Sequence, residues 1–159
     1  MFKLPFDTNK PVEGKATVVI NKSIAEVFSF IGEHFFENYP KWAVDVLEFE
    51  ALDGNKAVVG AKARQLRKDQ GKEVKSVFQI SEYRPLVYIS FKGITVDYRD
   101  YYLLKTNETE STTQLTYCFE LLNVELFMRP FEKLLRIAIE DGAEATTDNI
   151  KNLLLSKNS

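Results

Sequence analysis

The chain has 159 residues, of which 45% are apolar, 28% charged and 13% aromatic, and this length is typical of one compact domain. Its 21 lysines and arginines are balanced by 23 aspartates and glutamates, so we expect no nucleic-acid partner, because phosphate binding normally requires a basic excess. The single histidine, His34, and the single cysteine, Cys118, exclude a Cys/His zinc site and an intramolecular disulfide. Composition alone leaves an all-carboxylate magnesium or calcium site open, but we expect no metal and no cofactor.

The first residues favour a cytoplasmic location. Over residues 1–11 the apolar side chains form a broken cluster, too short for the core of a signal peptide and far from the roughly 20 residues of a membrane span. No repeat, linker or low-complexity segment divides the chain. We therefore expect a single domain over residues 1–159, with its core between about residues 14 and 155.

The N-terminal part predicts one strand followed by two short helices. Apolar residues alternate with a period of two over 15–21, which is typical of a half-buried strand. Ser23 and Glu26 have the spacing of a capping box, in which the hydroxyl accepts from the Glu26 amide and the carboxylate accepts from the Ser23 amide. Gly32 is expected to end this helix, and the aromatic residues around Pro40 indicate a second short helix.

Six further strands are expected, separated by turns, near residues 44–52, 59–69, 73–83, 86–93, 94–105 and 112–122. The clearest hairpin turns are 53–55 and 70–72, each with a central glycine. Because the connections are short, an antiparallel meander is the simplest pairing.

The last segment has a helical pattern from Pro130 to about Leu155, since apolar or small residues recur at gaps of three and four. About 25 residues at roughly 1.5 Å each give a helix near 38 Å long, enough to cross a whole sheet. Small residues occupy the middle of its expected inward face, at Ala138, Gly142 and Ala145. Glycine in a helix interior costs about 1 kcal/mol relative to alanine, so we expect a compensating reason for Gly142.

The predicted order of elements defines an α+β fold in which a curved antiparallel sheet of about seven strands wraps on a long C-terminal helix. Here the sequence resembles the START-related (SRPBCC) superfamily, which includes birch-pollen-allergen-like proteins and the polyketide cyclase/dehydrase and lipid-transport group. The matching residues are Val18-Val19-Ile20, Ser23, Glu26-Val27-Phe28, Tyr39-Pro40, Trp42, Gly60, Glu82-Tyr83-Arg84-Pro85 and the terminal helix. The resemblance covers almost the whole chain from about residue 14. It implies a helix-grip fold with a hydrophobic cavity between sheet and helix, used in the family for lipids, hormones and polyketides.

Strand periodicity points to the side chains that would line such a cavity, because every second residue of a strand faces the same side. Leu47 falls on this apolar face. The candidate ligand-binding residues are Phe49, Gln65, Arg67, Phe78, Phe91, Tyr98, Asp100, Tyr117 and Phe119 from the strands, with Ala138 and Gly142 from the helix. Two explanations of the small helix residues stay open: close packing or a kink at Gly142, and an internal volume completed by a ligand. The family resemblance favours the second.

Asp100 is the charged residue of most interest, because it lies in phase with apolar neighbours and burial of an unpaired charge is unfavourable. It could pair with Arg67, sit in water at the cavity mouth, or be turned outward by a bulge. It could instead orient a ligand. Cys118 lies out of phase with the inward face and no activating base is visible, so an inert thiol is expected.

Three functions of different classes follow. The first is a START-like domain that binds or carries a hydrophobic small molecule or lipid-like ligand, with no catalytic residues assigned. The second is an enzyme of the polyketide cyclase/aromatase type, in which Asp100 or a tyrosine moves a proton. The third is an interaction protein whose exposed aromatic segment, Phe35–Trp42, docks a partner or a membrane surface. No stable membrane insertion is expected, and a homodimer is compatible with the sequence.

Overall fold

The computed structural model describes residues 10–69, 71–107 and 109–156, so most of the segment used above to argue against a signal peptide lies outside the described residues. The element order is β1 (Val12–Ile20), α1 (Ile24–Phe28), the π-helical η1 (Ser29–Glu33), α2 (Phe35–Trp42), β2 (Val46–Ala51), β3 (Lys62–Asp69), β4 (Lys72–Arg84), β5 (Tyr88–Gly93), β6 (Tyr98–Asn107), β7 (Thr112–Leu121), the 3-10 helix η2 (Leu126–Phe131) and α3 (Glu132–Ser156).

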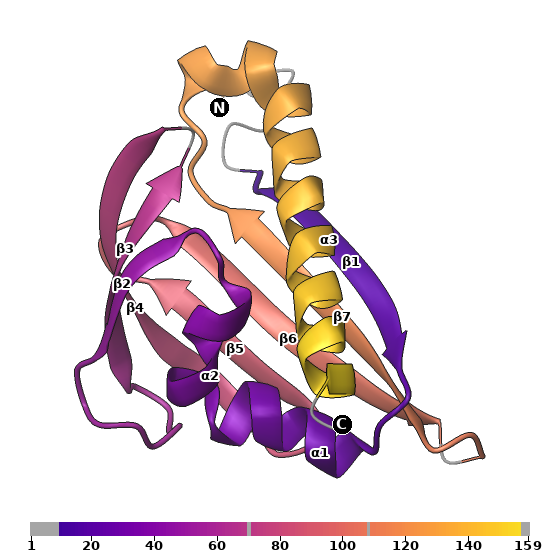
Figure 1. Cartoon of the computed structure of the whole chain (residues 1–159). Helices are drawn as coiled ribbons and strands as arrows, with labels where there is room; N and C mark the ends of the chain where they lie inside the picture. The colour runs from indigo at the N-terminus through magenta and orange to yellow at the C-terminus, as the bar shows by residue number, and fades with distance from the viewer. Residues whose placement is uncertain (1–9, 70, 108, 157–159) are drawn as a thin grey trace, which may run out of the picture.

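The seven strands form one antiparallel sheet in the order β1-β7-β6-β5-β4-β3-β2. Strands β2 to β7 are a meander, and β1 joins it at the β7 edge. Helix α3 crosses the concave face of the sheet and packs mainly on β1 and β7, while α1 and α2 lie toward one end of the molecule and η2 lies at the other (Figure 1). The predicted α+β fold, a curved sheet wrapped on a long C-terminal helix, is confirmed.

A close approach joins α3 to the sheet at Gly14. A Cβ atom built on Gly14 would lie 2.7 Å from the backbone nitrogen of Glu140 and 2.9 Å from a methyl group of Ile139. Any side chain at this position would push the helix away from β1. Glycine here therefore fixes the distance between α3 and the edge of the sheet.

Several predicted boundaries shift. The helix after Ser23 continues through η1, so Gly32 lies inside the helical segment and does not end it. Gly54 makes a turn with φ of 84°, but β3 begins only at Lys62, so residues 53–55 start a longer connection and not a tight hairpin. The expected hairpin at Gly71 is present, with Asp69 paired to Lys72.

The predicted inward position of Leu47 is wrong. The pairing of β2 with β3 shifts register between Val46 and Glu48, and this irregularity reverses the alternation before it. Val46 therefore packs against the core, whereas Leu47 is 51% exposed.

The aromatic residues of α2 form the centre of the core. Phe35, Phe36, Tyr39 and Trp42 are all buried, and Phe35 has ring contacts with six other aromatic side chains. The hypothesis of an exposed aromatic segment for docking a partner or membrane is thus wrong. Within the described residues, no helix is long and apolar enough to span a membrane.

We expect Ser23→Ala to lower the free energy of unfolding by about 0.5 to 2 kcal/mol, because Ser23 Oγ accepts the Glu26 amide at 3.2 Å and caps α1. The return bond of the capping box, from the Ser23 amide to the Glu26 carboxylate, is not formed. Urea denaturation followed by circular dichroism measures the loss. Glu26→Ala is the matched control and should have a smaller effect; an equal effect would contradict the one-sided cap.

Candidate functional site

A cavity of about 360 Å³ lies between the concave face of the sheet and α3. Its roof is one face of α3, formed by Leu135, Ala138, Ile139, Gly142, Ala143 and Thr146. Its walls come from β3, β4, β6 and β7, through Gln65, Arg67, Asp69, Val74, Ser76, Tyr98, Asp100, Tyr117, Phe119 and Leu121, together with Val96 and the α2 residue Tyr39. The long helix therefore spans an open volume.

Gly142 explains why the helix leaves this space. A Cβ atom built on Gly142 would have no heavy atom within 4 Å, so the glycine is not required by close packing with the sheet. The middle of the predicted inward face is partly wrong: Ala138, Gly142 and Ala145 are all exposed, and Ala138 and Gly142 line the cavity whereas Ala145 does not. The buried side chains of α3 are Ala143, which also lines the cavity, and Thr147, Ile150 and Leu154, which do not, so the buried face is rotated from the predicted one.

The closed end of the cavity is formed by aromatic packing. Three predicted ligand-binding residues, Phe49, Phe78 and Phe91, do not line the cavity because α2 covers them. The Phe35 ring lies 4.3 Å from that of Phe91, and the Tyr39 ring lies 5.3 Å from that of Phe49. The insertion of α2 between these rings and the cavity could not be derived from strand periodicity.

Polar groups at this end are linked by hydrogen bonds. The Tyr39 hydroxyl donates to Gln65 Oε1 at 2.9 Å, and Gln65 Nε2 donates to Ser76 Oγ at 3.3 Å. Both Gln65 and Ser76 are buried. These two hydrogen bonds give both the oxygen and the nitrogen of the Gln65 amide a partner within the protein. They therefore stabilise the cavity wall without a ligand.

Asp100 is differently placed. Its Oδ2 accepts a hydrogen bond from the Tyr117 hydroxyl at 2.7 Å, whereas its Oδ1 is buried and has no partner. Burial raises the pKa of the carboxyl to about 7, although the bond from Tyr117 and the charge of Arg67 both lower it. Asp100 can therefore change protonation near neutral pH.

The alternative of an Arg67–Asp100 ion pair is wrong for these two described residues. Arg67 Nε lies 4.0 Å from Asp69 Oδ1, toward the exposed end of β3, and Asp100 is bonded to Tyr117. No bulge turns Asp100 outward either, because β6 pairs continuously with β5 and β7 around it, opposite Phe91 and Phe119. Asp100 thus faces the cavity.

The tyrosines around Asp100 are held neutral. Burial raises the pKa of Tyr39 to about 12 and raises those of Tyr98 and Tyr117 well above 10. The Tyr98 ring stacks on Phe119 with the ring centroids 5.2 Å apart. The aromatic wall therefore offers hydroxyl groups and ring faces, with the charge confined to Asp100, Arg67 and Asp69.

Eight of the eleven predicted ligand-binding residues line the cavity: Gln65, Arg67, Tyr98, Asp100, Tyr117, Phe119, Ala138 and Gly142. Residues not predicted as part of the site include Tyr39 and Leu135, Ile139 and Thr146 of the roof. The helical period from Leu135 through Ile139 to Gly142 and Thr146, at gaps of four and three, was the signal that could have found the roof.

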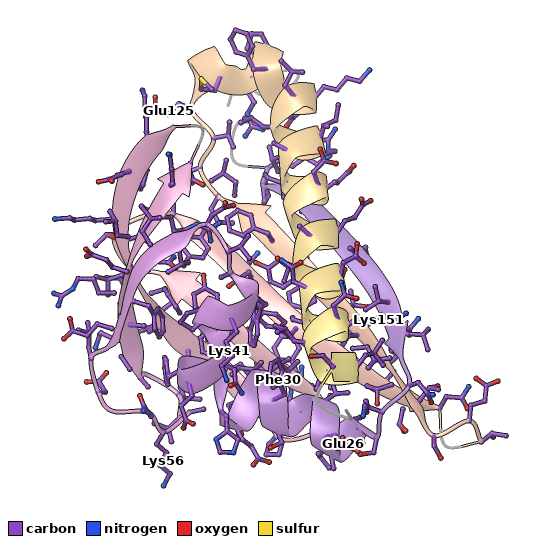
Figure 2. All side chains as sticks on the ribbon, in the orientation of Figure 1. Glu26, Phe30, Lys41, Lys56, Glu125 and Lys151 are labelled. Carbon is purple, nitrogen blue, oxygen red and sulfur yellow. The ribbon has the colours of Figure 1, made fainter. Side chains whose placement is uncertain are left out.

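A second depression, of about 620 Å³, is open and lies over α1, η1 and α2. Figure 2 shows two of its residues, Glu26 and Phe30, at the opposite end of the molecule from Glu125. Its buried polar residue, Asn38, already donates to the Phe30 carbonyl and accepts from Lys41 Nζ. Because these groups are satisfied within the fold, the cavity under α3 is the better candidate site.

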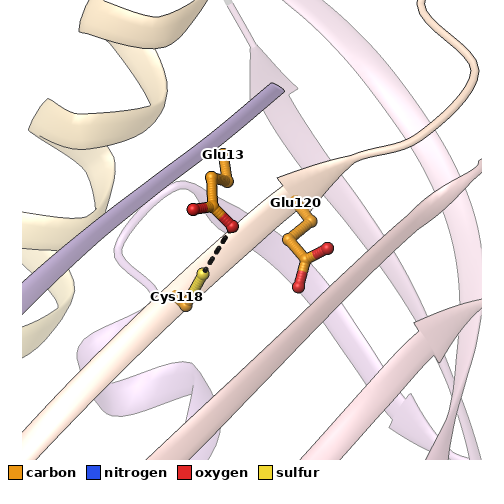
Figure 3. Close-up of side chains that lie close together, drawn as sticks. All are labelled: Glu13, Cys118 and Glu120. Atoms are coloured by element: carbon orange, nitrogen blue, oxygen red, sulfur yellow. Dashed lines mark hydrogen bonds between the residues drawn. The ribbon is translucent and has the colours of Figure 1, made fainter. Parts of the chain in front are cut away.

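On the outer face of the sheet, Glu13, Cys118 and Glu120 lie close together (Figure 3). Burial raises the pKa of the Cys118 thiol to about 11, which keeps it protonated and supports the expectation of an inert thiol. Glu120 already accepts from Arg99 at 2.6 Å. This cluster is therefore explained by ordinary contacts of the sheet surface.

A curved antiparallel sheet closed by one long helix over a cavity defines the helix-grip class of folds. The chain belongs to the family described as polyketide cyclase / dehydrase and lipid transport, which matches residues 11–154. The description of this family joins polyketide cyclases and dehydrases with lipid transport. No curated protein matches the sequence.

Solved structures agree with this fold at low sequence identity. A protein from Thermus thermophilus is 15% identical with a TM-score of 0.75, covering 92% of this chain and 99% of that one. The Zhui aromatase/cyclase from Streptomyces sp. R1128 is 12% identical with a TM-score of 0.75, covering 94% and 97%. A START superfamily protein from Mycobacterium smegmatis is 12% identical with a TM-score of 0.72, covering 91% and 97%. These likenesses concern the fold alone.

Proposed function

We propose that the chain is a START-like domain that binds or carries an apolar small molecule in the cavity between the sheet and α3. The observation that carries this proposal is the unfilled volume between the sheet and α3, which the exposed Gly142 lines and where a Cβ atom on that glycine would meet no atom within 4 Å. A volume of about 360 Å³ is within the range of small-molecule sites.

The lining supports an apolar ligand with a limited polar part. Leu135, Ile139, Phe119 and Leu121 offer apolar surface, and burial of such surface contributes about 25 cal/mol per Å² removed from water. The polar groups are gathered near Asp100 and Gln65. A ligand would therefore gain most of its affinity from the apolar contacts and its orientation from the polar end.

Gly142→Leu is expected to abolish binding of the fluorescent probe anilinonaphthalene sulfonate while the fold remains intact. Because Gly142 lines the cavity, we expect a leucine side chain there to occupy part of it; filling a true void costs little stability, whereas overpacking costs about 1 to 3 kcal/mol. Fluorescence titration and a thermal melt measure the two effects.

Ala145→Leu is the matched control, because Ala145 lies on the same helix and is exposed, as Gly142 is, but does not line the cavity. It should bind the probe like the unmodified protein. Strong destabilisation by Gly142→Leu, or equal probe binding by all three proteins, would overturn the proposal.

A second candidate is an enzyme of the polyketide cyclase/aromatase type, favoured by the hydrogen-bonded Asp100–Tyr117 pair. A carboxyl group whose pKa is about 7 can accept and return a proton at neutral pH. Proton transfer by Asp100 would make turnover of a poly-carbonyl substrate fall about 10²- to 10⁴-fold in Asp100→Asn at similar affinity. Unchanged turnover in this variant would exclude Asp100 from catalysis.

A further inference from the structure

Asp100 has a hydrogen-bonding capacity that the protein itself leaves unused. Its Oδ1 is the one buried side-chain acceptor without a partner among the described residues. Two donors of the lining are engaged within the fold: Tyr117 donates to Oδ2, and Gln65 Nε2 donates to Ser76. Tyr98 and Arg67 also line the cavity, but neither is hydrogen-bonded to Asp100. Because an unsatisfied buried acceptor is unfavourable by about 1 to 3 kcal/mol, this oxygen calls for a donor from outside the chain.

Because Asp100 lines the cavity, a molecule bound in the cavity can supply that donor. The residue lines the cavity from the middle of the sheet, on β6. In the observed orientation Oδ1 is buried, but the torsion about the Cβ–Cγ bond is soft, so rotation of the carboxyl group turns Oδ1 toward the cavity, and a half-turn exchanges the two oxygens. In either orientation one oxygen is left for a group that enters from the cavity.

We propose that the cavity ligand carries a hydroxyl group, as an alcohol or a phenol, that donates a hydrogen bond to Asp100 while its apolar body lies under α3. This inference rests on the proposed ligand-binding function and specifies the chemical class of the ligand. The ligand hydroxyl oxygen also has lone pairs, so it can accept a hydrogen bond from a tyrosine hydroxyl of the lining while it donates to Asp100.

Other end groups fit this position less well. A ligand carboxylate would be repelled by ionised Asp100. An ammonium group would face the positive charge of Arg67, which also lines the cavity, and would lose its hydration on burial. A plain hydrocarbon would leave Oδ1 unsatisfied. A neutral hydroxyl satisfies the oxygen without adding a buried charge.

The arrangement also sets which end of the ligand enters first. Along β3 the side chains change from buried Gln65 to partly exposed Arg67 and then to exposed Asp69. Val96, two residues before β6, and Val74 on β4 also line the cavity and are exposed. Asp100 lies inward of this mouth, so the hydroxyl end enters first and the apolar body follows, beneath Leu135 and Ile139.

The test compares naphthol with its methyl ether, methoxynaphthalene, which has the same ring but no donor. Calorimetric titration at about pH 8, where Asp100 is ionised, should show naphthol binding about 10- to 100-fold more tightly, the range for one charge-assisted hydrogen bond. Asp100→Asn should reduce this preference to near unity. Asp97→Asn makes the same chemical change on an exposed residue bonded to Asn123 and should leave the preference intact.

Repetition at about pH 5.5 adds a second readout. Protonated Asp100 can donate from Oδ1 to either probe, so the preference for naphthol should fall. The other ionisable groups that line the cavity are Arg67, Asp69, Tyr39, Tyr98 and Tyr117, and burial raises the pKa of each of these tyrosines far above this range. Asp100→Asn should remove the change with pH.

The outcomes separate this inference from the proposed function. If both probes bind equally and Gly142→Leu blocks both, the cavity binds ligands but the hydroxyl assignment is wrong, and water satisfies Asp100. If neither probe displaces anilinonaphthalene sulfonate and Gly142→Leu has no effect on that probe, the ligand-binding function itself is overturned. A naphthol preference that survives in Asp100→Asn would assign the donor site to another residue.

Discussion

Replacement of Asp100 by asparagine should make the protein more stable at pH 8, by about 1 to 4 kcal/mol, and should flatten its stability profile between about pH 4 and pH 7. Burial raises the pKa of Asp100 from 3.8 to about 7 in the folded protein. Between these two values the folded state keeps a proton that the unfolded chain releases. Stability is therefore lost as pH rises from about 4 to about 7, and the loss is complete above the folded-state pKa.

Urea denaturation at several pH values in this range gives the free energy of unfolding of the unmodified protein and of Asp100→Asn. The difference between the two at each pH isolates the effect of Asp100, because unrelated groups titrate alike in both proteins. Asp97→Asn provides the control, because Asp97 is exposed and lies outside the cavity lining. It should give a difference from the unmodified protein that hardly varies with pH. A constant destabilisation by Asp100→Asn at every pH would show that the ionised carboxylate is a structural partner and not a strained group.

Phe35→Ala should lower the free energy of unfolding by about 3 to 5 kcal/mol. The Phe35 ring is almost fully buried and contacts the rings of Phe36, Tyr39, Trp42, Phe78, Phe91 and Tyr102. Its removal leaves a void at the closed end of the cavity, because these neighbours are held by the sheet and by α2. Circular dichroism during urea denaturation measures the loss without dependence on the nearby Trp42.

Phe131→Ala is the matched control, since Phe131 is 51% exposed at the end of η2. Its change should stay within about 0.5 kcal/mol. If the two variants lose similar amounts of stability, the aromatic cluster around α2 is not the centre of the core.

Strand phase predicted much of the cavity wall. On β6 and β7, the residues Tyr98, Asp100, Tyr117 and Phe119 keep their predicted inward direction because these strands pair without irregularity. The predicted inward position of Leu47 was wrong because a register shift in β2 changes which residues face the core. No local sequence signal marks that shift.

The closed end of the cavity was the part that strand patterns could not predict. Phe78 and Phe91 do face the concave side, but whether a ligand or a helix covers them depends on how α2 folds back over the sheet. This is a long-range contact that periodicity does not contain. Asp100 differs, because its partner Tyr117 lies on the neighbouring strand β7, two residues from the directly paired Phe119, whereas Arg67 lies three strands away on β3.

The pairing of β1 with β7 has a consequence for how the protein is made. Val12 pairs with Leu121 and Ile20 with Thr113, so the first strand synthesised must wait for the last before it gains a neighbour in the sheet. Helix α3 then docks on β1 at Gly14. Contacts between such distant parts of a chain slow folding, because the entropy cost of closing the loop arises before the contact stabilises the structure. On the ribosome, the cavity therefore closes only after α3 has emerged, so a nascent chain that ends before α3 has no roof with which to retain a ligand.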